Sequence, residues 1–129
     1  MNQHTILGER ILSSANSLEP YARIVRSSHE RIDGQGYPDG LSGREIPLAS
    51  RIIFACDSFN AMTTQRPYAK VRSREEATEE LRRCANSQFD SRVVESLCDV
   101  LDAGVEPADD APETNGVPPV PLTLIPAPA

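Results

Sequence analysis

The feature that most constrains the fold of this chain is a cluster of glycines near its middle. Four of the seven glycines lie within the ten positions 34–43, together with Pro38. Glycine reaches backbone conformations that other residues rarely adopt, and proline interrupts helices and sheet ladders. A regular element therefore cannot continue through residues 32–47, and we expect a long loop there with several special backbone conformations.

On both sides of this loop, apolar residues recur at spacings of three and four, which is typical of amphipathic helices. We expect five helices. Thr5 opens the first, Pro20 lies in the first turn of the second, and Leu48 begins the third. No segment alternates with a period of two for long enough to predict a strand. The fold class predicted is all-α, a helical bundle with one long loop rich in glycine and proline.

Local signals mark the ends of the later helices. The third helix should end before the Arg66-Pro67 pair, because the residue before a proline resists helical geometry. Ser73-Arg74-Glu75-Glu76 has the spacing of a capping box and opens the fourth helix, and Asp90 caps the fifth, which Gly104 ends. The residues expected to face the core are Leu7, Ile11 and Ala15, then Tyr21, Ile24 and Val25, then Leu48, Ile52, Ala55, Cys56, Phe59 and Met62, then Ala77, Leu81 and Cys84, and finally Val94, Leu97, Cys98 and Leu101.

The last 25 residues differ in composition from the rest of the chain. Residues 105–129 hold seven of the eleven prolines and four acidic residues, but no lysine, arginine or aromatic residue. Such a segment buries too little apolar surface to offset the entropy of ordering it. We predict one globular unit over residues 1–104, followed by a disordered, acidic, proline-rich tail.

Charge, hydropathy and cysteine usage exclude several classes of function. The formal net charge of −6 argues against a surface for duplex nucleic acid. No apolar run approaches the roughly 18 residues that a membrane span needs, and the N-terminus lacks the pattern of a signal peptide. The three cysteines show no C-x-x-C spacing and lie in apolar helical stretches, which favours buried thiols. A cytoplasmic, reducing location follows as the expectation.

Asp57 is the most unusual residue of the helical regions. Between Ile52 and Gln65 it is the only charged side chain, so it should be buried on at least one side. A buried carboxylate needs a cation, a metal ion or strong hydrogen-bond donors. One interpretation is a salt bridge to Arg51 or Arg66.

The second interpretation of Asp57 is a metal site. The chain has only two histidines, His4 and His29, and with Asp57 they are the minimum for a three-ligand site that has open positions. Arg66 and Lys70 follow the same helix and could hold a phosphate, although solvated surface charges are their default interpretation. The glycine-rich stretch lacks the features of a P-loop or a dinucleotide fingerprint.

Four ordered blocks of the chain form a recognisable pattern, and the most specific of them is HERIDGQGYPDGLSGREIP at residues 29–47. This block resembles the signature H-H-E-x-x-D-G-x-G-Y-P of the HD-GYP family of bacterial phosphohydrolases. The blocks ACDSFNAMTTQRPY at 55–68, SREEATEELRRCANSQFDSRVVESL at 73–97 and HTILGERIL at 4–12 resemble further parts of the same family. The likeness covers essentially all of residues 1–104.

The resemblance implies an α-helical, metal-dependent phosphodiesterase that typically cleaves cyclic di-GMP. It implies two or three divalent ions in the full domain, often iron or manganese, which activate water and hold the phosphate. Carried over residue by residue, His4, His29 and Asp57 fall on metal-ligand positions, Tyr37 lies beside the substrate pocket, and Arg66 stands where a phosphate contact is expected. On this basis the metal interpretation of Asp57 replaces the salt bridge.

The chain also departs from the family pattern. Ser28 stands in place of the first histidine of the H-H pair, Asn60 where a second aspartate is usual, and Ala69 where a basic residue often follows R-P-Y. The His-Asp doublet that names the family is absent from the chain, so the catalytic residues stay unassigned. We expect the C-terminal two-thirds of such a domain, with apolar faces left exposed on its first three helices.

Two functions from different classes follow from the resemblance. The first is a phosphodiesterase for cyclic dinucleotides, impaired in this chain. The second is a degenerate, non-catalytic module that binds a nucleotide or a GGDEF cyclase domain through the glycine-rich loop. Response-regulator or sensor domains are further partners that the resemblance suggests.

Overall fold

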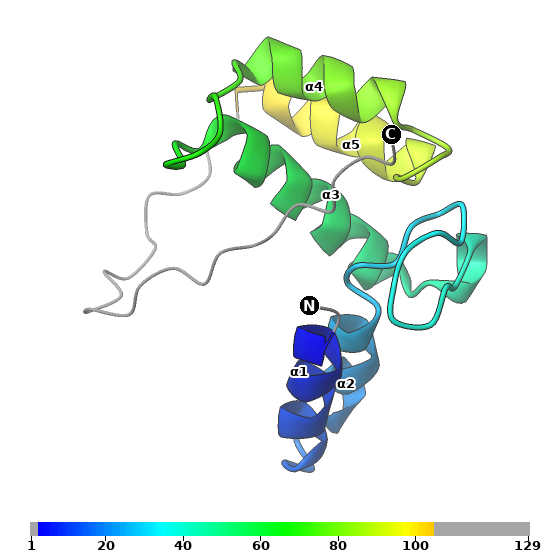
Figure 1. Cartoon of the computed structure of the whole chain (residues 1–129). Coiled ribbons are helices and arrows are strands. Elements are labelled where there is room, and N and C mark those ends of the chain that lie inside the picture. Colours follow the sequence, from blue (N-terminus) through cyan, green and yellow to red (C-terminus); the bar gives the residue numbers. More distant parts are fainter. Residues whose placement is uncertain (1–2, 105–129) are drawn as a thin grey trace.

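A computed structural model describes residues 3–104 of the chain, which form helices joined by turns and loops (Figure 1). This confirms the predicted all-α class. Isolated bridges such as Asp33–Ser42 are the sole β pairings in the part described. The helices are α1 (Gln3–Ser13), α2 (Glu19–Arg26), η1 (Gly43–Glu45), α3 (Leu48–Thr63), α4 (Arg74–Arg83) and α5 (Ser91–Asp102).

Helix α3 joins two groups of helices. Helices α1 and α2 lie side by side as a hairpin, and α2 contacts α3. Helices α4 and α5 pack against each other and against α3 at the other end of the molecule (Figure 1). The long loop between α2 and α3 lies where the two groups meet.

The local signals at the starts of α4 and α5 are confirmed, whereas Thr5 does not open α1, which begins at Gln3. The Ser73 hydroxyl accepts a hydrogen bond from the backbone N–H of Glu76, and the Glu76 carboxylate accepts one from the N–H of Ser73, which completes the capping box of α4. The Asp90 carboxylate accepts from the N–H of Arg92 at the start of α5. These bonds satisfy N–H groups that have no partner within a helix.

The main core lies between α3, α4 and α5. Phe54 of α3 packs on Phe89 with ring centroids 5.0 Å apart. Leu81 of α4 and Cys98 of α5 are completely buried, as their helical spacing predicts. The buried cluster consists of Phe54, Ala55, Leu81, Cys84, Phe89, Val93, Val94 and Cys98.

The loop between α2 and α3 has the special backbone geometry that its glycines predict. Three of these glycines have positive φ angles, namely Gly34, Gly40 and Gly43. The loop is tied to the turn between α4 and α5, because the N–H groups of Ile32 and Asp33 donate to the carbonyls of Gln88 and Ser87. Its position is therefore fixed by the larger helical group.

The inward faces of the first and third helices differ from the prediction. Leu7 and Ile11 of α1 are 58% and 61% exposed, and α1 begins at Gln3 with Thr5 as its buried residue. Leu48 and Ile52 of α3 are also exposed, because the core side of α3 is formed by its small and aromatic residues. Apolar side chains that were predicted to face the core are therefore exposed on α1 and α3.

Further expectations concern the cysteines and the tail. Cys84 and Cys98 are buried as predicted, but Cys56 is exposed, because it lies on the same outer face of α3 as Ile52. The predicted disordered tail, residues 105–129, lies outside the described residues. No helix in the described part is long and apolar enough to span a membrane.

Candidate metal and phosphate site

Three rings from separate segments converge at the junction of the helical groups. His4 comes from α1, His29 follows α2, and Tyr37 lies in the glycine-rich loop. The ring centroids of His4 and His29 are 4.9 Å apart, and those of His29 and Tyr37 are 5.3 Å apart with nearly parallel planes. We call these three residues the ring cluster.

His29 is the central and most buried member of the ring cluster. Its ring stacks on Tyr37, the nearly perpendicular ring of Phe54 lies 6.4 Å away between centroids, and only 9% of the surface of His29 is exposed. Burial, together with the nearby His4, lowers the pKa of His29 below its ordinary value. The imidazole is therefore neutral at pH 7, which is the form that binds metal ions.

Gly36 lets the loop approach the chain next to His29. The N–H of Tyr37 donates to the carbonyl of His29 at 3.2 Å. A Cβ atom at position 36 would lie 2.3 Å from the backbone nitrogen of Arg31 and 2.6 Å from the carbonyl oxygen of His29. Only glycine fits this close approach, which brings the next residue, Tyr37, against the His29 ring.

Glu30 holds the far side of the loop, and sequence analysis missed it. Its carboxylate is 2% exposed and accepts hydrogen bonds from the N–H groups of Asp39, at 2.7 Å, and Leu41, at 3.0 Å. A buried charge with two backbone donors is well satisfied. The signal available in the sequence was an acidic residue directly before the glycine-rich loop. Backbone N–H groups of such a loop have no helical hydrogen-bond partners and can donate to a carboxylate.

Arg26 and Asp39 were also missed. The Arg26 guanidinium donates to both carboxylate oxygens of Asp39, at 2.8 and 2.9 Å, and to Glu9 of α1 at 2.6 Å. The bond to Arg26 lowers the pKa of Asp39, and the two carboxylates together raise that of Arg26. These contacts link α1, α2 and the loop.

The structure contradicts a salt bridge between Asp57 and Arg51. Arg51 donates to Asp90 and to the carbonyl of Ile46 instead. Asp57 is half-buried in α3, no cation within residues 3–104 pairs with it, and burial raises the pKa of its carboxyl. An unpaired, partly desolvated carboxylate is the kind of group that a bound cation would stabilise.

The residue types fit a divalent metal ion, and the structure assembles part of the set. His4 and His29 lie together, and Asp57 follows Phe54, which touches the His29 ring, by one turn of α3. Within the described residues, however, no group of three histidine, cysteine or carboxylate side chains is arranged closely enough to hold an ion. The assignment of His4, His29 and Asp57 as ligands therefore stays a prediction.

The substituted family positions have other partners. The Ser28 hydroxyl donates to the carbonyl of Val25 at 2.8 Å, so it belongs to the end of α2. The exposed Asn60 accepts from the Thr64 hydroxyl near the end of α3.

The predicted phosphate-binding residues lie beyond α3. Arg66 is half-buried and pairs through its backbone with Ala69. Lys70 is exposed and lines a cavity of about 780 Å³ between α3, the 64–72 segment and α4. None of the ring cluster lines this cavity, so the substrate positions predicted for Tyr37 and Lys70 do not lie in one described pocket.

The sequence of the chain matches a known protein family and several characterised relatives. The HD domain family matches residues 1–93. Over 99 residues the chain is 44% identical to a cyclic di-GMP phosphodiesterase of Thermotoga maritima, and it is 37% identical to the response regulator RpfG, a cyclic di-GMP phosphodiesterase of Xanthomonas campestris. Each of these matches covers 75% of the chain.

A solved structure supports the same comparison. A cyclic GMP-AMP specific phosphodiesterase of Vibrio cholerae superposes with a TM-score of 0.67 at 26% identity, over 76% of this chain and 22% of that one. The chain spans 27% and 26% of the lengths of the Thermotoga and Xanthomonas relatives. The matched region is thus about a quarter of each of these proteins.

Proposed function

The chain belongs to the HD domain family, of the HD-GYP type that its signature resembles, and on this premise we propose that it acts in a metal-dependent phosphodiesterase that hydrolyses cyclic di-GMP. The observation that carries the proposal is the ring cluster, in which two histidines distant in sequence meet beside a loop tyrosine. HD-domain phosphohydrolases are divalent-metal enzymes as a class. Iron or manganese is the ion we propose for this chain, held in a cytoplasmic enzyme.

His4, His29 and Asp57 are the proposed ligands. A bound divalent ion would supply Lewis-acid chemistry, polarising the phosphate and lowering the pKa of water. The buried, neutral His29 offers a ring nitrogen without first losing a proton, and Asp57 offers a carboxylate that no cation within residues 3–104 neutralises.

The remaining site residues are proposed to bind substrate. Tyr37 presents an aromatic face next to His29, suited to stacking on a base. Arg66 is proposed to hold a phosphate by two parallel hydrogen bonds, and Lys70 to add a positive charge at the cavity beyond α3.

The position of Ser28 favours a second candidate function. Because its hydroxyl donates to a helix carbonyl, it supplies no ligand where the family pattern has a histidine. The alternative is a non-catalytic module that binds a cyclic dinucleotide, or a GGDEF or sensor domain, through the loop that carries Tyr37.

Metal content and turnover together test the proposal. The full chain is loaded with manganese, or anaerobically with iron, and its metal is measured by mass spectrometry while cyclic di-GMP hydrolysis is followed by chromatography. We expect Asp57→Ala and His29→Ala to lose metal, and Asp99→Ala, an exposed carboxylate on α5, to keep it. Undiminished metal in Asp57→Ala would contradict the ligand assignment. Nucleotide binding without turnover would favour the non-catalytic module.

A further inference from the structure

We propose that Arg26 is the positioning residue of the ring cluster, and that it acts by holding helix α1 and the glycine-rich loop to the end of α2. The inference rests on the proposed function, because the ring cluster is the metal and substrate site suggested above. Within residues 3–104, the side-chain hydrogen bonds of Arg26 go to Glu9 and Asp39 and not to the three rings. It acts through the two segments that carry His4 and Tyr37.

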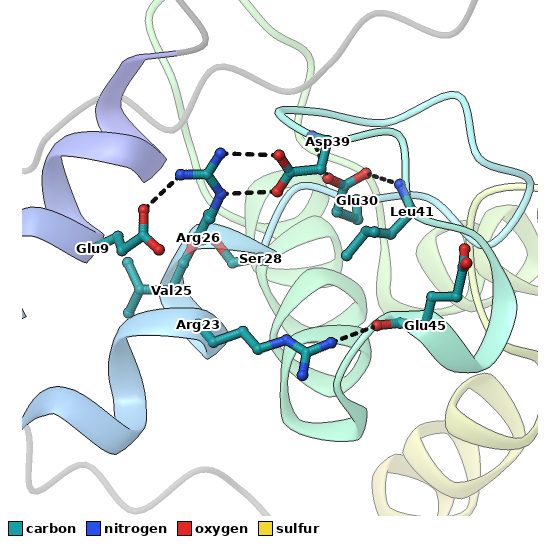
Figure 2. Close-up of polar contacts among 9 residues, drawn as sticks. All are labelled: Glu9, Arg23, Val25, Arg26, Ser28, Glu30, Asp39, Leu41 and Glu45. Carbon is teal, nitrogen blue, oxygen red and sulfur yellow. Dashed lines mark hydrogen bonds and ion pairs between the residues drawn. The ribbon is translucent and has the colours of Figure 1, made fainter.

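Arg26 contacts both segments at once. Figure 2 shows its guanidinium between the carboxylates of Glu9 and Asp39, with one hydrogen bond to Glu9 and two to Asp39. Glu9 lies in α1, the helix of His4, and Asp39 follows Tyr37 by two residues. A planar guanidinium with several fixed donors is suited to join two carboxylates in a defined geometry.

We call the Arg26–Asp39 contact the loop arm and the Arg26–Glu9 contact the α1 arm. On the loop arm, Asp39 is fixed at two points. The Asp39 side chain is held by Arg26, and its backbone N–H donates to the buried Glu30 carboxylate (Figure 2). Glu30 directly follows His29 in the chain. The loop beyond Tyr37 is therefore anchored to the same stretch of chain that carries the central ring.

The α1 arm determines the position of the second histidine, His4. Helix α1 packs on α2 closely enough that a Cβ atom at Gly8 would lie 2.7 Å from the Val25 side chain. Close packing restricts the separation of the two helices, and the Arg26–Glu9 pair adds a polar contact that restricts sliding and rotation of α1. His4 lies about 1.4 turns before Glu9 on the same helix, so movement of α1 displaces its ring relative to His29.

The exposure of the ion pairs makes the proposal testable without loss of the fold. The side chains of Arg26 and Glu9 are each 29% exposed, and that of Asp39 is 37% exposed. Pairs of this kind contribute modestly to stability. Their removal should therefore loosen the segments and leave the buried cluster of α3, α4 and α5 intact.

The experiment measures ring-to-ring nuclear Overhauser effects by NMR in the full metal-free chain. We expect Arg26→Ala to lose the His4–His29 and His29–Tyr37 effects. The matched control, Arg23→Ala, removes the same charge one turn earlier on α2. Among residues 3–104 the Arg23 side chain donates to the Glu45 carbonyl and to neither Glu9 nor Asp39 (Figure 2), so this variant should keep both effects.

Single-arm variants separate positioning from general loosening. Glu9→Ala should weaken the His4–His29 effect and keep the His29–Tyr37 effect, whereas Asp39→Ala should do the reverse. Arg26→Lys keeps the charge but not the fork of donors, and should restore at most one arm. These two single-arm variants also decide the question if Arg26→Ala does not fold.

Calorimetry with manganese gives the second readout. We expect about tenfold weaker binding in Arg26→Ala and unchanged binding in Arg23→Ala, in line with the effect of residues that orient metal ligands. Retention of both ring effects in Arg26→Ala, or loss of both in each single-arm variant, would overturn the proposal. The nuclear Overhauser effects between the rings require neither metal nor nucleotide. If the chain shows no phosphodiesterase activity but each single-arm variant loses the effect predicted for it, the proposed function is refuted and the role of Arg26 is not.

Discussion

A methyl group added at Gly36 should displace the loop from the ring cluster. The Cβ atom of alanine at this position would lie 2.3 Å from the nitrogen of Arg31, 2.6 Å from the Cα atom of Glu30 and 2.6 Å from the oxygen of His29. All three are backbone atoms, so rotation of a side chain cannot relieve the contacts. The loop must move away from the chain around His29.

The expected cost follows from comparison with a second glycine in the same loop. Overpacking a tight site typically costs about 1 to 3 kcal/mol, and three unavoidable contacts place Gly36→Ala at about 3 kcal/mol. At Gly43 a Cβ atom meets nothing within 4 Å, but its φ of +52° is left-handed. Gly43→Ala should therefore cost only the conformational penalty of roughly 1 kcal/mol.

Thermal and urea unfolding of the full chain, each followed by circular dichroism, test this difference through Tm and the free energy of unfolding. For a unit of about 100 residues, Gly36→Ala should lower Tm by roughly 12 to 24 °C, at 4 to 8 °C per kcal/mol. It should also weaken the His29–Tyr37 ring contact, which Gly43→Ala should keep. Equal stability of the two variants, within about 0.5 kcal/mol, would refute the argument from close approach.

Three further predictions concern paired and unpaired charges. Asp90→Ala should destabilise the chain by roughly 3 to 5 kcal/mol in urea unfolding, because it leaves Arg51 buried without its partner; a loss below about 1 kcal/mol would show that the pair contributes little. Burial lowers the pKa of His29 in the fold, so the unfolded chain binds a proton first and the free energy of unfolding should fall as pH drops below 6.5. His29→Asn should flatten that pH dependence, and an unchanged profile would contradict it. Because burial raises the pKa of Asp57, its negative charge destabilises the fold at neutral pH. Asp57→Asn should therefore raise the Tm of the metal-free chain at pH 7 but not at pH 3. A lower Tm of this variant at pH 7 would show that the carboxylate has a stabilising partner.

The starts of α4 and α5 could be predicted because their signals are local. The Ser73–Glu76 box and the Asp90 cap depend on side chains within three residues of the N–H groups that they satisfy. The special geometry of the loop could also be predicted, because the ability to adopt a positive φ angle is a property of each glycine itself. Both partners of such an interaction lie within a few residues of each other, so a short stretch of sequence is enough to predict it.

The orientation of the helices could not be predicted in the same way. Leu7 and Ile11 have the spacing of a buried stripe, yet they are exposed, because periodicity identifies a face and not what packs against it. Arg26 and Glu30 were missed for a related reason. Their partner Asp39 lies 13 and 9 residues away, across a loop whose path no periodic pattern specifies.

The alternative pairing of Asp57 with Arg51, by contrast, could be excluded from the sequence alone. Arg51 and Asp57 are six positions apart, which on a helix with 3.6 residues per turn places them roughly 120° apart around the axis. Helical pairs that meet are three or four positions apart. The Asp90 cap of α5 is the partner that Arg51 reaches instead, at 2.5 Å.

The distribution of partners distinguishes Asp57 from the other buried or half-buried carboxylates. Asp90 is paired with Arg51, Glu30 with two backbone N–H groups, and the half-buried Glu80 with Arg83. Asp57 is half-buried without a cation within residues 3–104, and burial moves its pKa upward. A fold that satisfies its other buried carboxylates bears an electrostatic cost at Asp57 that a bound ion would remove. This contrast supports Asp57 as a ligand on physical grounds that are independent of the family pattern.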